Sequence, residues 1–274
     1  MFIVFEDRLS DSPLVERVWR CHSTRAGTFH SVAASHLEMV VTRLRGNTFL
    51  TLRGPETRAT QAECPAEGEW IAIRFKLGAF MPRHPASALI DRKDENMPRA
   101  AARAFWLDGH RWEYPDYENA DTFVARLVRS GVVRFDRAVE AALQGDRKAL
   151  SRRSAQRHFL QATGVPFSTH RQIERARHAA RLLQQGTSIL DTVYEAGYFD
   201  QAHLTRSLRH LIGQTPARML RKEEQLSFLY NTTGIPPAYD SDDSGAQCHD
   251  DEDNLDRIHA LHARDSVSPV RQRY

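Results

Sequence analysis

The stretch EAGYFDQAHLTRSLRHLIGQTPARM, residues 195–219, decides how this sequence folds. Leucines recur in it at i, i+4 and i+7, the spacing that places side chains on one face of a helix; they are Leu204, Leu208 and Leu211. Asp200 is the predicted N-cap of this helix, and Gly213 ends it just before a Thr-Pro pair restarts a helix. We therefore expect a short amphipathic helix that packs its leucines inward and presents cationic and polar side chains outward.

The segment before this helix, residues 188–197, predicts another short helix with its own apolar stripe. Two short helices joined by a turn that contains glycine form a helix-turn-helix, whose second helix inserts N-terminal polar side chains into the DNA major groove. Arginine can bind guanine bidentately, and glutamine can bind adenine in the same way. The outward side chains of the second helix are Gln201, Ala202, Thr205, Arg206 and Arg209.

A similar pattern occurs upstream in SRRSAQRHFLQATG, residues 151–164, with Ser151 as the predicted N-cap and Gly164 at the end. Its outward side chains are Arg152, Arg153, Gln156 and Arg157. A predicted helix over residues 168–185 separates the two units; at ~1.5 Å per residue it spans about 27 Å. That length is close to the ~34 Å of one DNA turn, so both units can meet one face of a duplex.

The charge of the chain is concentrated in one segment. Residues 131–222 carry 16 basic and 7 acidic side chains, whereas residues 1–130 have a net charge of +1 and residues 223–274 a net charge of −7. A concentrated positive field favours phosphate or an anionic membrane surface. No apolar run of 18 residues is present, so we expect no membrane span.

Three β-rich runs precede the cationic segment. Residues 37–45 and 47–54 predict strands that meet at a Gly46-Asn47 turn, and the alternation in residues 69–77 predicts a half-buried strand. From about residue 86, including MPRAAARAFWL, residues 97–107, we expect short helical or loop pieces. A helix is predicted over residues 120–131.

From residue 132 to about residue 230 the sequence predicts helices alone. The acidic segment after it, residues 231–274, is poor in large apolar residues, so we expect a disordered tail. Its charge motivates the hypothesis that it competes with phosphate for the cationic segment.

Residues 135–222 resemble the AraC/XylS family of transcriptional regulators. ILDTVYEAGYFDQAHLTRSLRHLIGQTPARM is similar to the second helix-turn-helix of that family throughout, and RQIERARHAARLL resembles its linker helix. The resemblance implies that bases are read by Arg153, Gln156, Arg157, Gln201, Ala202, Thr205 and Arg206. One departure is that FDRAVEAALQGDRKALS, residues 135–151, is about one helix too short. Either residues 135–144 serve directly as the scaffold of the first unit, or that unit docks less well.

Residues 1–130 resemble, more loosely, the small β-sandwich or cupin-like sensor domain of some of these regulators. The resemblance implies an α+β protein: this domain, then an all-α domain over residues 131–230 with two helix-turn-helix units and a linker helix, then the acidic tail over residues 231–274. Its implied partners are double-stranded DNA, a small-molecule effector and a second subunit.

The sequence contains few patterns typical of metal-binding or catalytic sites. His203 and His210 lack the cysteine or carboxylate partner of a zinc site. The β-rich part contains His30 and His36 but no His-X-His pair. We therefore expect no bound metal, no other cofactor and no enzymatic activity. Cys21 and His22 are adjacent on a strand and point to opposite faces. Sparse cysteines and the absence of a leader-like N-terminus predict the cytoplasm. Two alternatives remain open: a metal-dependent cupin-type enzyme fused to a DNA-binding half, and a non-specific nucleic-acid binder.

Overall fold

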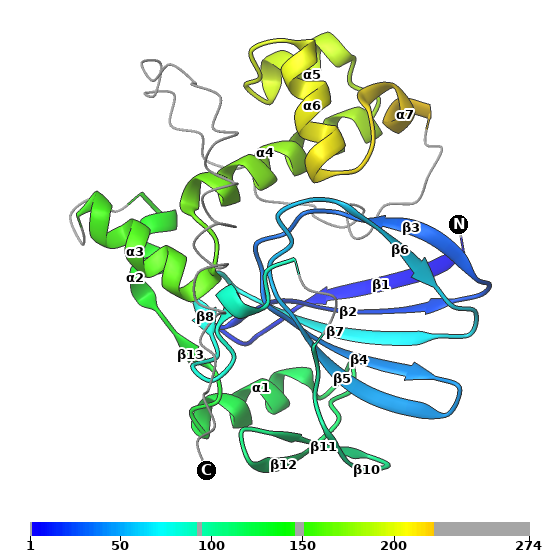
Figure 1. Cartoon of the computed structure of the whole chain (residues 1–274), viewed down its shortest axis with the longest axis vertical. Helices are drawn as coiled ribbons and strands as arrows, with labels where there is room; N and C mark the ends of the chain where they lie inside the picture. The colour runs from blue at the N-terminus through cyan, green and yellow to red at the C-terminus, as the bar shows by residue number, and fades with distance from the viewer. Residues whose placement is uncertain (1, 92–94, 146–150, 222–274) are drawn as a thin grey trace, which may run out of the picture. The chain divides into compact units, whose positions relative to one another are not determined.

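The structure, a computed structural model, describes residues 2–91, 95–145 and 151–221, all of which belong to one structural unit, Met1–Thr233 (Figure 1). The β-rich part contains, in chain order, β1 (Ile3–Leu9), β2 (Val15–Ser23), β3 (Gly27–Ser31), β4 (Glu38–Leu44), β5 (Asn47–Arg53), β6 (Thr60–Cys64), β7 (Glu69–Phe75), β8 (Ala79–Phe80), the 3-10 turn η1 (Ala86–Ala88), β9 (Glu95–Asn96), β10 (Arg99–Ala101), β11 (Ala104–Leu107) and β12 (His110–Glu113).

A six-stranded antiparallel sheet with the order β1-β2-β7-β4-β5-β9 forms the centre of this part. The predicted hairpin between β4 and β5 is confirmed, but its two-residue loop is Arg45 and Gly46, one position before the predicted Gly46-Asn47 turn. Both loop residues have positive φ, 49° and 75°, as a type I′ turn requires. Strands β3 and β6 pair in a separate two-stranded sheet.

Each face of the six-stranded sheet carries a cluster of buried side chains. Ile73 lies in the large core that includes residues of α1 and β11, whereas Trp19, Val40 and Ala72 form a second buried cluster. The strand predicted over residues 69–77 is confirmed as β7, but the expectation that it is only half-buried is wrong, since Ala72 and even Arg74 are buried on the face expected to meet water. Alternation marks two faces, but it does not show whether the polar face is covered.

Residues 97–107, expected to be helical or loop, instead contribute strands β10 and β11. Phe105 is fully buried against the ring of Tyr114, with centroids 5.2 Å apart, while its neighbour Trp106 stays exposed. This period of two comes from packing, which overrides the helix propensity of the alanines.

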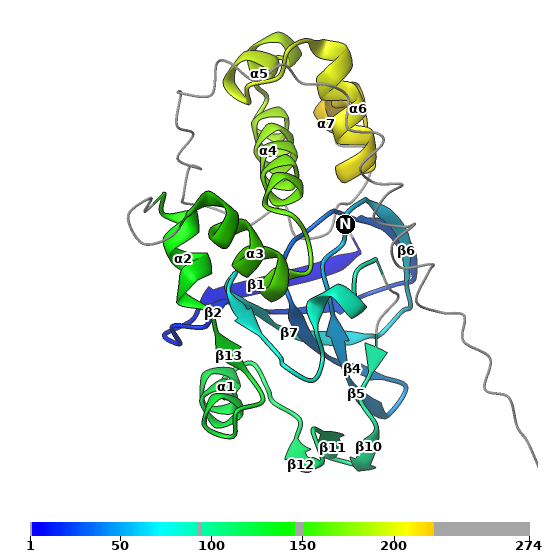
Figure 2. The same ribbon diagram turned by 60° about the vertical axis from the view of Figure 1, so that its left-hand side comes forward.

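The helical elements are α1 (Ala120–Arg129), α2 (Arg137–Leu143), α3 (Arg152–Thr163), α4 (Phe167–Gln184), α5 (Ile189–Glu195), α6 (Gln201–Leu211) and α7 (Pro216–Arg221). The prediction of helices alone from residue 132 to about residue 230 fails at β13 (Arg134–Phe135), which pairs with β8; residues 146–150 and 222–230 of this range lie outside the described residues. Helices α2 and α3 lie side by side in Figures 1 and 2 and contact each other.

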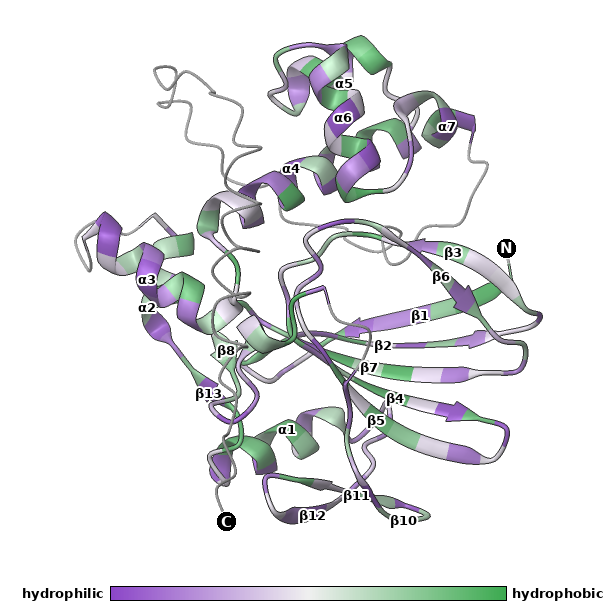
Figure 3. Cartoon of the chain, in the orientation of Figure 1, coloured by the Kyte–Doolittle hydropathy of each residue, from purple (hydrophilic) through white to green (hydrophobic). Residues whose placement is uncertain are grey.

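The predicted helix signals are confirmed. Ser151 and Asp200 accept hydrogen bonds from backbone N–H groups of the first turns of α3 and α6, and Gly164 ends α3 at φ 78°. Hydrophobic residues alternate with hydrophilic ones along α4 and α6 in Figure 3. The inward stripe of α4 is buried as expected; it consists of Ile173, Ala176, Ala180 and Leu183.

The predicted acidic tail, residues 231–274, lies outside the described residues. Among the helices of the described ranges, none combines the length and the apolar character needed to cross a membrane.

Candidate nucleic-acid interface

Helix α6 separates an apolar face from a polar one. Its leucine stripe is buried together with Ile212. Gln201, Ala202, Arg206 and Arg209 are exposed, and Thr205 is half-buried. The Thr205 hydroxyl donates to the carbonyl of Gln201 at 2.7 Å, so its hydrogen is engaged within the helix. The exposed guanidinium and amide groups remain available for contacts outside the chain.

Tyr198, which the sequence patterns did not single out, holds α6 in place. Its ring is buried, lies 5.0 Å from the guanidinium of Arg175 on α4, and packs edge-on against His203 with centroids 5.0 Å apart. Its hydroxyl is 2.9 Å from the Ser207 hydroxyl. A buried tyrosine must satisfy its hydroxyl, and here it does so on the helix that it supports. The only sequence signal for this role is its position just before the N-cap.

Helix α3 presents a second polar face. Arg152, Arg153, Gln156 and Arg157 are all exposed, whereas Phe159 is fully buried beside Val139 of α2. Asp136, the N-cap of α2, also bonds to His158 of α3 at 2.7 Å. Of the two alternatives for the short first unit, this packing favours the one in which residues 135–144 support α3 directly.

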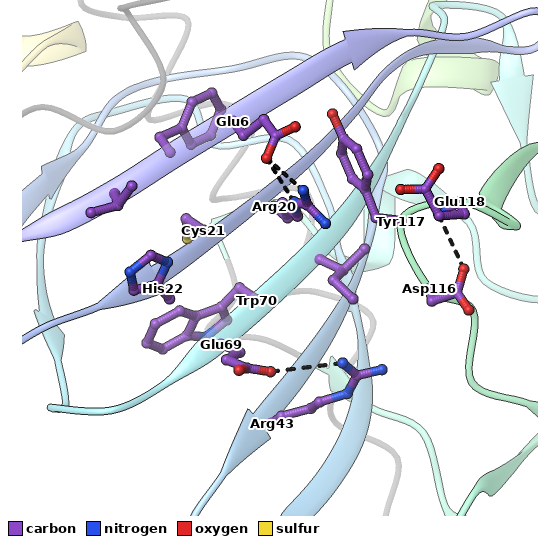
Figure 4. A pocket seen from close by; sticks show the side chains of 13 residues that line it. Glu6, Arg20, Cys21, His22, Arg43, Glu69, Trp70, Asp116, Tyr117 and Glu118 are labelled. Atoms are coloured by element: carbon purple, nitrogen blue, oxygen red, sulfur yellow. Dashed lines mark hydrogen bonds and ion pairs between the residues drawn. The ribbon is translucent and has the colours of Figure 1, made fainter.

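A cleft of about 440 Å³ opens at one end of the six-stranded sheet (Figure 4). Ile71 and Tyr117 provide buried apolar surface, and the Arg20 guanidinium lies 4.4 Å from the Tyr117 ring centroid. Arg20 and Glu6 are paired at 2.7 Å, and Arg43 and Glu69 at 3.7 Å. The cleft thus combines aromatic surface with charged groups, which suits a small molecule of mixed polarity.

The cysteine and histidines considered as a nucleophile or as metal ligands lie in environments that do not suit those roles. Burial raises the pKa of the Cys21 thiol to about 12, and the nearby Cys64 acts in the same sense, so the thiol is protonated and unreactive near neutral pH. His36 Nε2 lies 2.9 Å from Glu16, and His203 packs on Tyr198. In the described ranges, no three His, Cys, Asp or Glu side chains are grouped so that they could hold a metal ion.

Comparisons with known proteins give one family model and two named transcriptional regulators. A family model described as "Helix-turn-helix domain" matches residues 145–222. The chain is 38% identical over 90 residues to the HTH-type transcriptional regulator GlxA of Rhizobium meliloti, covering 32% of this chain and 26% of the relative. It is 31% identical over 112 residues to the HTH-type transcriptional regulator RipA of Corynebacterium glutamicum, covering 41% of this chain and 31% of the relative.

The match therefore spans less than a third of the length of either relative. Among solved structures, ToxT from Vibrio cholerae aligns over 79% of this chain and 98% of its own, with 10% identity and a TM-score of 0.36, which is too low to assign a shared fold.

Proposed function

We propose that this chain, which carries an AraC-type helix-turn-helix domain at residues 145–222, is a transcriptional regulator that binds specific sequences in double-stranded DNA. The family resemblance noted in the sequence is confirmed for this segment. Sequence-specific binding and the use of two helix-turn-helix units extend beyond this match of residues 145–222.

The observation that carries the proposal is the polar face of α6. Asp200 caps the helix, and Gln201 and Arg206 project from its first turns into open surroundings, while the leucine stripe is buried behind them. In a helix-turn-helix the side chains in these first turns of the second helix reach base edges. Arginine and glutamine at these positions provide bidentate donors for guanine and adenine.

The second reading unit of the proposal is the α2–α3 pair. Four cationic or amide side chains project from the first half of α3, and the Asp136–His158 bond fixes that helix on α2. Helix α4, which connects the two units, has 18 residues and at ~1.5 Å per residue spans about 27 Å. Both can then contact successive major-groove segments on one face of the duplex.

Regulation by a small molecule is a further part of the proposal, and we place its binding site in the cleft around Tyr117. Its volume lies within the ~300–1,000 Å³ usual for ligand pockets, and its Arg20 and Glu6 side chains offer opposite charges beside an aromatic ring. Two subunits can also pair through the β-rich part. On this proposal the protein acts in the cytoplasm and is not an enzyme.

Selection of bound fragments from genomic DNA tests the function. Purified protein should enrich a common motif, and a duplex containing it should resist competition by random duplex by about 10³-fold or more. Equal competition by random duplex would identify a non-specific binder. Stoichiometric metal in the purified protein would favour the metal-dependent cupin-type enzyme.

A further inference from the structure

The connection between β3 and β4, residues 32–37, is hydrogen-bonded to the helical part, and we call it the strap. The Ala33 N–H donates to the carbonyl of Leu211 at 2.8 Å, and in the neighbouring β5–β6 connection the Ala59 N–H donates to the carbonyl of His210, also at 2.8 Å. Both carbonyls belong to the last turn of α6, where carbonyl groups have no N–H donor within the helix. The β-rich part thus caps the C-terminus of this helix.

Apolar burial accompanies these hydrogen bonds. Val32 and Ala33 of the strap lie in the same buried cluster as Leu208 of α6 and Ile173 of α4. The strap therefore completes the core of the helical part. Its removal would expose apolar surface that α4 and α6 cannot cover by themselves.

Helix α4 meets the strap through buried polar groups. Arg177 donates to the carbonyl of Ala33 at 3.3 Å, and His170 Nδ1 lies 3.2 Å from the Ser35 hydroxyl. Glu174, one turn before Arg177, lies 3.8 Å from its guanidinium. All three α4 groups therefore lie at the surface that faces the β-rich part.

The β-rich part contributes the matching charges. Glu16 pairs with His36 of the strap at 2.9 Å, and the buried Arg74 donates to Glu38 at 2.7 Å. Burial tends to raise the pKa of Glu16, but His36, Arg74 and Arg177 outweigh it and hold the pKa well below its usual range. Buried charges are stable only with their partners in place, so a mixed cluster of this kind favours one relative geometry.

Helix α3 is held on the β-rich part by a separate contact. A Cβ added at Gly164, the C-cap of α3, would lie 2.6 Å from the backbone nitrogen of Ser87 in η1. The backbone of α3 therefore packs directly against this segment. Both helices proposed to read bases are anchored to one body, and each leaves its polar N-terminal face exposed.

Building on the proposed function, we infer that the strap is the positioning contact of α6: it holds this helix in the orientation in which Gln201 and Arg206 meet DNA together with α3. Preorganised binding groups lose less conformational freedom on association. Release of the strap therefore lowers DNA affinity, and a ligand or partner that moves the strap controls it.

Gly213, just after α6, offers a sharp test. It has φ +86°, and an added Cβ would lie 2.8 Å from Nδ1 of His30 and 3.3 Å from Cβ of Ala59. Gly186, after α4, has φ +94°, and a Cβ added there would have no atom within 4 Å. Gly213→Ala and Gly186→Ala thus share the backbone strain, but only Gly213→Ala pushes against the β-rich part.

The DNA readout uses the duplex selected from genomic fragments. Gly213→Ala should bind it about tenfold more weakly than Gly186→Ala, within the ~5–150-fold typical of coupling between sites. On a duplex in which the bases sensed by Arg206 are scrambled, the two variants should bind alike. A general loss of folded protein would instead weaken binding to both duplexes.

Amide hydrogen exchange measures the contact between α6 and the β-rich part directly, without DNA. Exchange at Ala33 and Ala59 should accelerate in Gly213→Ala and not in Gly186→Ala. Arg177→Met, which removes the α4 contact, provides a second variant with the same expected results. If neither variant accelerates exchange at these amides, the strap is not held as we infer.

The remaining outcomes separate the two proposals. Accelerated exchange with unchanged or higher DNA affinity would overturn the positioning role, since the strap would then be neutral or inhibitory. Failure of the wild-type protein to select any duplex would instead remove the proposed function, while the exchange data would still report the contact.

Discussion

Asp136 joins two helices, because its Oδ2 lies 2.7 Å from Nδ1 of His158 on α3 while its Oδ1 accepts from the N–H of Ala138 on α2 at 2.9 Å. One carboxylate thus caps α2 and ties α3 to it. A seven-residue helix is marginal in isolation, so α2 depends on such contacts.

Asp136→Ala should destabilise the protein by about 1–2 kcal/mol, because it removes both the N-cap and the bond to His158. Asp136→Asn retains a capping oxygen and should cost less. Chemical denaturation of the three proteins measures the difference. Equal stability of Asp136→Ala and wild type would show that α2 and α3 are held together by their apolar contact alone.

Gly164→Ala should be much more destabilising than Gly109→Ala, although both glycines have φ +78°. The positive φ costs roughly 1 kcal/mol in each case. Only at Gly164 would the new Cβ meet backbone, 2.6 Å from the nitrogen of Ser87, whereas Gly109 has open space. Thermal unfolding of the two variants provides the comparison, and similar melting temperatures would contradict the close packing of α3 on this segment.

Arg206→Ala should weaken binding to the selected duplex by ~1–3 kcal/mol and relax one base preference. The guanidinium is exposed on the polar face of α6, so the fold should be unaffected. Arg111→Ala, which removes an exposed arginine from β12, is the matched control and should bind as wild type does. Equal losses on selected and random duplexes would mean that Arg206 contacts phosphate and reads no base.

Stability should fall as the pH drops from about 6.5 to about 4. Burial lowers the pKa of His170 to about 4, although Glu174 acts in the opposite sense. The unfolded chain therefore takes up a proton near pH 6.5, while the folded protein does not until about pH 4, so this contribution is complete above pH 6.5 and lost below it. At ~1.4 kcal/mol per unit, the loss is on the order of 3 kcal/mol.

His170→Gln tests this assignment, because glutamine can bond to Ser35 without titrating. Its free energy of unfolding should vary much less than that of wild type between pH 6.5 and 4.5. The lowered pKa of Glu16 acts in both proteins, mainly below pH 4.5, and does not separate them. Parallel profiles of the two proteins would assign the pH dependence to other groups.

Deletion of residues 236–274 should raise DNA affinity at low salt if the acidic tail competes with phosphate for the cationic segment. The effect should shrink as salt rises, because screening weakens both interactions. A titration at two salt concentrations measures it. Unchanged affinity at low salt would rule out the competition.

Several features of this protein are determined by short-range sequence patterns. The leucine stripe of α6, the caps at Ser151 and Asp200 and the hairpin loop at Gly46 all depend on residues within a few positions of one another. Local sterics and hydrogen bonds decide such features, so the helices and the exposed polar faces of α3 and α6 could be predicted. Whether those faces read bases stays a prediction.

Tertiary structure alone decided what no local pattern contains. Ser35 and His170 meet although they are 135 positions apart, and Ala33 reaches the last turn of α6. The same long-range packing buries both faces of β7 and turns the alanine-rich residues 99–107 into strands. Residue spacing along the chain does not predict such contacts, because their free energy depends on which surfaces the completed fold brings together.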